Sequence, residues 1–506
     1  MRKIYAIAMA AGVLFFAGCT REDSVSSGDD NVGVIQTEPL TAKKINSLID
    51  HAIQTKGSFN WKDMSAHELW SASIHGDNIF SIGFGNSSND FDRSKSTKHR
   101  VIQQEILELI SQYEDKPLNE ILISADQVLT TMDVVITRQE TVIALRRSDY
   151  IRYLEPGNYK YFSVADSMRR ESESSSSSSS GCGFDALLLD PADYTTITPN
   201  AKAGWSLYQH NIPAAWNIST GSGVTIGIVD TGVSPQQSLL GTSFNDGMSS
   251  GRTLQKYGTY VDSIWPWSTT TDGPNDQCGH GTSMASAAAA PRNDDGLPVG
   301  VAYNANLITY RAASNVVLDG MHEQNGVKNA LTALGNNSAV KIISMSMGHI
   351  FSVGKISDGI KYAYGKGKLI FCAGGTSTSF TNFVGVIFPA SMAETVAVTG
   401  VKEGSTYQLC SDCHSGSKIE FTVVMERATS GNHSPVLSYY NNQTDYVGGS
   451  SVATATTAGI AALVWSKYPT WTRSQVLARM RQSGTFYPVK HSSFGYGNIN
   501  ALTAVQ

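Results

Sequence analysis

The chain has 506 residues, 41% of them hydrophobic, a length and composition that predict roughly two to four domains and at least one large core. The formal net charge is only −5, and this lack of a basic excess argues against a nucleic-acid partner.

The first residues have the layout of a secretory signal peptide. The basic start "MRK" precedes the apolar run "IYAIAMAAGVLFFAG", which is shorter than the roughly 20 residues of a membrane-spanning helix. Small residues directly before Cys19 resemble the lipobox of bacterial lipoproteins. This resemblance implies removal of residues 1–18, acylation of Cys19 and a lipid anchor in the cell envelope. The acidic pair Glu22 and Asp23 resembles surface-export signals of some Gram-negative lipoproteins, which implies an anchor at the outer membrane or cell surface of such a bacterium. The alternative is an ordinary secretory signal followed by a coincidental cysteine.

Residues 19–40 are expected to form a tether and residues 41–157 a small α+β domain. Apolar residues recur at helical spacing in two segments: residues 43–53 and 101–113. Strands are expected in three alternating or β-branched segments: residues 78–85, 133–139 and 141–147.

A low-complexity stretch then separates this domain from the rest of the chain. Residues 158–183 contain "ESESSSSSSSG", which offers nothing to bury and therefore predicts a linker. In residues 184–506, strand-like and helix-like segments alternate, which predicts an α/β domain with a mostly parallel sheet flanked by helices.

Five cysteines remain besides Cys19, so at least one thiol must stay unpaired in a compartment that permits disulfides. Cys372, in the apolar run "KLIFCAGG", is expected to be that buried thiol. Cys410 and Cys413 lie in "CSDCHSG" and are interpreted as a local disulfide or two loop thiols. Haem attachment through C-x-x-C-H is the less favoured alternative, and neither a cofactor nor a metal is predicted.

An aspartate ends an apolar strand in "VTIGIVDTG", residues 224–232. Functional groups gather at the carboxyl ends of parallel strands, which is where Asp230 would lie. Two other interpretations stay open. Aspartic proteases also use D-T-G but need two such carboxylates, and an aspartate after a strand can simply cap the next element.

A histidine and two adjacent serines each precede a helix rich in small residues. His280 lies between glycines in "QCGHGTSMASAAAAP", and Ser450 and Ser451 begin the helix in "YVGGSSVATATTAGIAALVW". At such a helix start a hydroxyl meets the positive end of the dipole, and a free backbone N–H can face an oxyanion. Considered one at a time, these residues are better interpreted as a structural histidine packed in the core and a serine that caps its helix.

In the order Asp, His, Ser, the three motifs together resemble the subtilisin-like serine proteases, or subtilases. The likeness continues in "GVAYNANLITYRA", "FPASMAETVAVTGV" and "FGYGNINALTAV", and covers roughly residues 200–506. The family pattern G-T-S-M-A-S-P-x-V-A-G aligns with "GSSVATATTAG". The resemblance therefore implies a subtilisin-like fold, protein or peptide substrates, and a triad of Asp230, His280 and the nucleophile Ser451.

The same resemblance implies a substrate groove and an oxyanion hole. The stretch "IISMSMG" is similar to the strand that borders the groove, which assigns Ser346, Met347 and Gly348 to it.

In "FCAGGTS", Gly375 takes the place of the asparagine that donates to the oxyanion in the family. Thr376, Asn382 or a water could replace that donor. If none does, the chain is a slow protease, or an impaired homologue that binds peptides or partners through the groove. Many relatives bind structural calcium, but no residue here is assigned to it.

The end of the first domain, "VIALRRSDYIRYLEPG", resembles the end of subtilase propeptides. This implies that the domain assists folding, blocks the groove, and is cut off in or after the linker, around residues 175–200. The cut would free the protease from its lipid anchor. The alternative is a permanent accessory domain.

Overall fold

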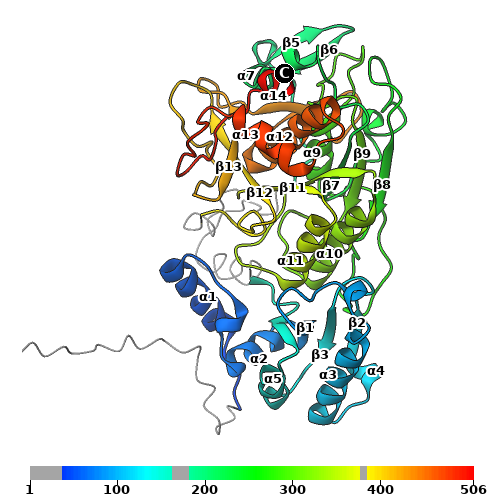
Figure 1. The fold of residues 1–506 in the computed structure, drawn as a ribbon, viewed down its shortest axis with the longest axis vertical. Helices are drawn as coiled ribbons and strands as arrows, with labels where there is room; N and C mark the ends of the chain where they lie inside the picture. Colours follow the sequence, from blue (N-terminus) through cyan, green and yellow to red (C-terminus); the bar gives the residue numbers. More distant parts are fainter. Residues whose placement is uncertain (1–36, 162–181, 376–384) are drawn as a thin grey trace, which may run out of the picture.

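The computed structural model describes residues 37–161, 182–375 and 385–506. Two sheets occupy opposite ends of an elongated molecule, with the N-terminal sheet at one end and the larger C-terminal sheet at the other (Figure 1). Several residues predicted to have a role lie outside the described ranges: Cys19, Thr376, Asn382 and the Ser-rich part of the linker.

The N-terminal part is a four-stranded antiparallel sheet in the order β2-β3-β1-β4, packed against helices. Its strands are β1 (Ile79–Phe84), β2 (Leu122–Ala125), β3 (Thr131–Val135) and β4 (Ile151–Pro156). Its helices are α1 (Ala42–Lys56), α2 (Ala66–Ile74), α3 (His99–Glu114), α4 (Leu118–Ile121) and α5 (Gln139–Arg146). Helices α1 and α3 confirm the helical prediction for residues 43–53 and 101–113.

The prediction of a strand at residues 141–147 was wrong, because this segment belongs to helix α5. A short apolar run does not distinguish a strand from a helix by itself. Val142 and Leu145 are three residues apart and both fully buried, so they lie on one helical face that packs against α2 and α3. Tertiary packing therefore decided the conformation.

The folded N-terminal part extends beyond its expected end at residue 157. Tyr159 and Tyr161 are buried in the N-terminal core, and the Tyr159 hydroxyl donates to the side chain of Asn46 on α1 at 2.6 Å. The first residues assigned to the linker are thus part of this fold.

The C-terminal part is built on a seven-stranded parallel sheet in the order β13-β12-β11-β10-β7-β9-β8, which confirms the predicted α/β class. Its strands are β7 (Thr225–Asp230), β8 (Leu254–Gly258), β9 (Asn306–Arg311), β10 (Val340–Met345), β11 (Leu369–Ala373), β12 (Val396–Lys402) and β13 (Ile419–Glu426). The longer flanking helices are α9 (His280–Ala289), α10 (Met321–Asn336), α11 (Gly354–Gly365), α12 (Gly449–Lys467) and α13 (Arg473–Gln482).

Smaller elements complete this part of the chain. They are the paired strands β5 (Tyr194–Ile197) with β6 (Ala201–Gly204) and β14 (Ser434–Leu437) with β15 (Thr444–Val447), and the short helices α7 (Trp205–Gln209), α8 (Ile212–Ala215) and α14 (Ala501–Val505). Within the described ranges, no helix combines the length and the apolar character needed to cross a membrane.

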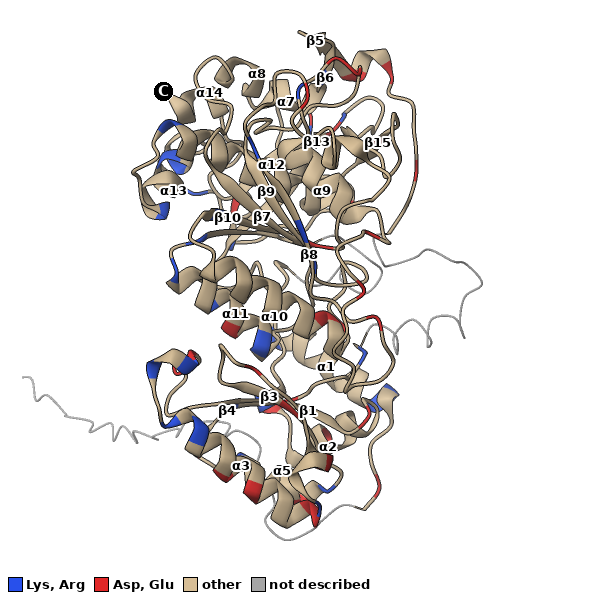
Figure 2. Ribbon diagram, turned by 90° about the vertical axis from the view of Figure 1, so that its right-hand side faces the viewer, with Lys and Arg blue, Asp and Glu red and all other residues tan. Residues whose placement is uncertain are grey.

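Helices α10 and α11 face the N-terminal sheet, and charged residues of both signs lie on this side of them (Figure 2). Asp133 on β3 pairs with Lys355 at 2.7 Å, and Asp358 pairs with Arg152 on β4 at 2.7 Å. Just before α11, Phe351 enters the N-terminal core, so charged and apolar contacts together join the two parts.

The cysteines outside the signal segment form two disulfides and leave one thiol. Cys182 pairs with Cys278, and Cys410 pairs with Cys413. Cys372 is free and buried, as predicted, and burial raises the pKa of its thiol. The first disulfide holds the end of the linker two residues before His280.

Candidate active site

The first two motif residues meet at the carboxyl end of the central strand β7. Asp230 is its last residue, and His280 begins α9. The Asp230 carboxylate accepts a hydrogen bond from His280 Nδ1 at 2.8 Å and another from the Thr231 backbone N–H at 2.8 Å. The start of α9 lies very close to the turn after β7. A Cβ on Gly281 would be 2.3 Å from the Gly232 carbonyl oxygen, so only glycine fits directly after His280.

The electrostatic environment favours the charged form of His280. Burial alone would lower the pKa of this imidazole, but the charge and hydrogen bond of Asp230 and the charge of Asp276 raise it above its usual value. A histidine that accepts a proton more readily is suited to act as a general base.

The two adjacent serines have different surroundings at the start of α12. Ser450 is fully buried, and its hydroxyl accepts a hydrogen bond from the Gly375 backbone N–H at 3.2 Å. From Gly449 to Trp465, every residue except Ser451 is buried. The Ser451 hydroxyl is 3.5 Å from the Ser346 carbonyl oxygen, and among the described contacts it forms no hydrogen bond with His280. Of the two serines, Ser451 is therefore the accessible one.

The three residues assigned to the groove lie directly after β10, next to Ser451. The Ser346 hydroxyl donates to the Ser451 carbonyl oxygen at 2.9 Å. The backbone of Gly348 is already paired, since its N–H donates to Val316 and its carbonyl accepts from Leu318. In this conformation, a peptide that binds here as an added strand would therefore pair with the backbone of Ser346 and Met347 and not with that of Gly348.

Gly375 has a backbone and a neighbour that fit glycine and not asparagine. Its φ is +128°, and a Cβ would lie 2.4 Å from His414 Nδ1. The His414 imidazole thus fills the space next to this position. Its Nδ1 donates to the Gly385 carbonyl at 2.9 Å, while its Nε2 is buried and has no hydrogen-bond partner among the described residues.

Sequence reasoning missed one polar residue at the site. Asp276 is 1% exposed and accepts hydrogen bonds from the loop and helix that carry His280. Its position four residues before His280, separated from it by a glutamine, a cysteine and a glycine, is the only signal of it in the sequence.

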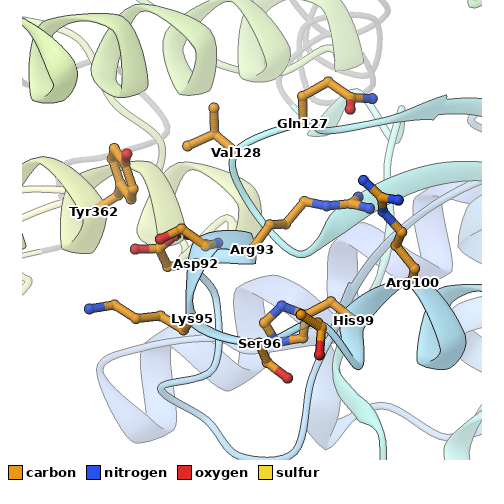
Figure 3. A pocket seen from close by; sticks show the side chains of 11 residues that line it. Asp92, Arg93, Lys95, Ser96, His99, Arg100, Gln127, Val128 and Tyr362 are labelled. Carbon is orange, nitrogen blue, oxygen red and sulfur yellow. Dashed lines mark hydrogen bonds between the residues drawn. The ribbon is translucent and has the colours of Figure 1, made fainter.

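Two other features of the described residues do not include Asp230, His280 or Ser451. Three exposed carboxylates, those of Asp246, Asp294 and Asp295, have oxygens within 4.8 Å of one another, and their spacing alone could suit a cation. A cavity of about 670 Å³ between the N-terminal part and α11 is lined by none of Asp230, His280 and Ser451. Figure 3 shows Arg93, Lys95 and Arg100 among its lining residues, with Tyr362 from α11 at one side.

Known proteases have sequences similar to that of this chain. An alkaline protease of Alkalihalobacillus alcalophilus is 27% identical over 332 residues, covering 64% of this chain and 76% of its own length. Thermitase of Thermoactinomyces vulgaris is 26% identical over 295 residues, covering 58% of this chain and 92% of its own.

A solved structure extends the likeness of the fold. Fervidolysin from Fervidobacterium pennivorans, a keratinolytic enzyme related to subtilisin, superimposes with a TM-score of 0.59 at 15% identity. The match covers 85% of this chain and 61% of fervidolysin. The model of the Subtilase family matches residues 221–498, a segment that contains Asp230, His280 and Ser451. The chain belongs to the Subtilase family and is a serine endopeptidase of subtilisin-like fold.

Proposed function

We propose that the chain hydrolyses peptide bonds with a catalytic triad of Asp230, His280 and Ser451. The observation that carries this proposal is the 2.8 Å hydrogen bond between His280 Nδ1 and Asp230, formed at the end of β7 beside helix α12, whose first turn contains Ser451. That hydrogen bond leaves Nε2 as the nitrogen that faces the substrate side in a triad.

In this proposal the Ser451 hydroxyl attacks the scissile carbonyl while His280 Nε2 takes its proton. The imidazolium then returns the proton to the leaving amine, and water hydrolyses the acyl-enzyme by the same route. Asp230 keeps the imidazole in the required tautomer and stabilises its charged form. The backbone N–H of Ser451 donates to the developing oxyanion. We also propose that Thr376 or Asn382 supplies a second hydrogen bond to this oxyanion, in place of the asparagine that Gly375 replaces.

The N-terminal part is proposed to act as an intramolecular inhibitor and folding aid that is cut off in the linker. Tyr161, the last residue described before the gap, lies with its ring 6.4 Å from that of His349, next to the groove residue Gly348. Cys182, the first residue after the gap, is bonded to Cys278 near His280. The chain therefore enters this segment near the proposed groove residue Gly348 and leaves it near His280, which supports cleavage of the segment by Ser451.

An acylated Cys19 would hold the uncut chain at the cell envelope, and cleavage in the linker would release the protease. The lipobox-like sequence before Cys19 supports this part of the proposal. It is refuted if a Cys19→Ser chain still fractionates with the membranes as the wild type does.

The experiment that tests the triad follows intact mass over time. Residues 20–506 are produced as wild type, as Ser451→Ala and as the matched control Ser450→Ala, and each is incubated with a denatured protein substrate. We expect the wild type to cut itself in or after the linker and to digest the substrate. Ser451→Ala should do neither, and Ser450→Ala should keep activity within roughly tenfold of wild type.

Two outcomes would contradict the proposal. If Ser451→Ala still cleaves, the nucleophile is another residue. If all three proteins stay intact and inactive, the glycine at position 375 leaves the oxyanion hole too weak, and a peptide- or partner-binding role takes precedence.

A further inference from the structure

We propose that Asp276 is a positioning residue for the same active site, because it joins the turn after Asp230 to the loop and helix that carry His280. This inference rests on the proposed triad. Asp276 does not touch the substrate in this proposal, and it acts through the two catalytic side chains.

One carboxylate oxygen of Asp276 connects the two catalytic segments. Oδ1 accepts from the Thr231 hydroxyl at 2.9 Å and from the backbone N–H groups of Cys278 and Gly279, both at 2.9 Å. Thr231 directly follows Asp230, and Gly279 directly precedes His280. A single oxygen thus fixes the neighbours of both catalytic residues.

The other oxygen holds the first turn of α9. Oδ2 accepts from the Thr282 backbone N–H at 3.0 Å and from the Thr282 hydroxyl at 2.6 Å. The Thr282 hydroxyl in turn accepts from the Ser234 N–H at 2.9 Å, which adds a second link to the turn after β7. With 1% exposure and no ion pair among the described residues, the carboxylate is held by these donors.

Thr231 completes the connection. Its hydroxyl accepts from the Gly281 N–H at 2.8 Å while it donates to Asp276, and its own backbone N–H donates to the Asp230 carboxylate at 2.8 Å. A change at Asp276 therefore alters the relative position of Asp230 and His280. A misplacement of about 1 Å can cost roughly 100-fold in rate.

Asp276 also contributes a buried negative charge. The pKa of His280 is raised by Asp230 and by Asp276, against the effect of burial. The other charged groups nearby are Asp272 and Arg311, which pair at 2.7 Å, and Tyr439 is a neutral neighbour whose hydroxyl donates to the Asp276 backbone carbonyl at 3.0 Å. Since Arg311 is already paired, the negative charges of Asp230 and Asp276 dominate around the imidazolium.

The test measures the His280 titration directly and separately from turnover. The full chain is made with isotope-labelled histidine in the Ser451→Ala background, with and without Asp276→Asn, and is titrated by NMR. The His280 resonance is identified by its loss in His280→Gln. We expect Asp276→Asn to lower the pKa of His280, because the substitution removes one of the two negative charges that raise it. The exposed carboxylate variant Asp246→Asn should leave it unchanged.

A second measurement separates position from charge. With Ser451 present, Thr231→Val removes the bridging hydroxyl but keeps the Asp276 charge. We expect kcat for a short peptide to fall roughly tenfold to 100-fold with KM nearly unchanged and the acidic limb of the pH profile in place. Asp276→Asn should lower kcat and also move that limb to lower pH. If Asp276→Asn does not fold, Thr231→Val and Thr282→Val carry the test.

An unchanged His280 pKa in Asp276→Asn, or wild-type kcat in Thr231→Val, overturns the proposal. If wild type fails to cleave any substrate while Asp276→Asn still lowers the pKa of His280, the proposed function fails and the link between Asp276 and His280 stands.

Discussion

Truncating Phe351 should weaken the attachment of the N-terminal part to the protease. Phe351 is 5% exposed and lies in the N-terminal core although it belongs to the C-terminal part. Its ring meets those of Phe59, Trp61 and Tyr161 edge-on, with centroid separations of 5.0, 5.7 and 6.0 Å. Edge-to-face pairs at these separations are favourable and add to the burial of the ring.

The magnitude follows from the loss of a buried aromatic ring. A Phe→Ala change in a packed core costs about 3–5 kcal/mol. The ring of Phe351 belongs to the C-terminal part but is buried in the N-terminal core. Its loss should therefore weaken the association of the two parts by this free energy. At 1.4 kcal/mol for each factor of ten, the dissociation constant should rise by roughly 10² to 4 × 10³.

The assay uses the Ser451→Ala chain, with a recognition sequence for a site-specific protease in place of the Ser run. After cleavage, the C-terminal part is immobilised and the release of the N-terminal fragment is followed for Phe351→Ala and for the control Val489→Ala, whose side chain is 75% exposed. If Phe351→Ala and Val489→Ala both release the fragment as slowly as the chain that carries neither substitution, Phe351 does not hold the two parts together.

Two further predictions concern pH and backbone strain. Burial raises the pKa of Glu155 to about 7 from 4.5, and its carboxylate accepts from the Gly354 N–H at 2.8 Å. Since the folded state favours the protonated form, the contribution of Glu155 to association is complete below pH 4.5 and declines as the pH rises to 7. The cleaved N-terminal fragment should therefore dissociate faster at high pH, and the same pH dependence in Glu155→Gln would argue against this cause. At position 375, φ is +128° and the His414 ring lies close. Gly375→Ala should therefore lower the free energy of unfolding by at least about 1 kcal/mol, seen as a lower melting temperature, and Gly375→Asn should not raise kcat/KM. A more active Gly375→Asn would show that the loop accommodates the family's asparagine.

Much of the architecture was predictable because its signals are local. Alternating strands and helices after residue 184 indicated the parallel sheet, and the burial of Cys372 followed from its apolar run. The same local information failed at residues 141–147, where the period of a short apolar run was ambiguous and packing against α2 and α3 decided for a helix.

The sequence by itself determined the family, the order of Asp230, His280 and Ser451, and the departure at Gly375, because each is carried by a few consecutive residues. Only the tertiary structure showed that Ser450 is buried while Ser451 is not, that Cys182 pairs with Cys278, and that Phe351 enters the N-terminal core. The role proposed for Asp276 also depends on contacts with Thr231, 45 residues away in the chain. Contacts between residues distant in sequence exist only once the sheet has brought its strand ends together, so no local pattern could reveal them.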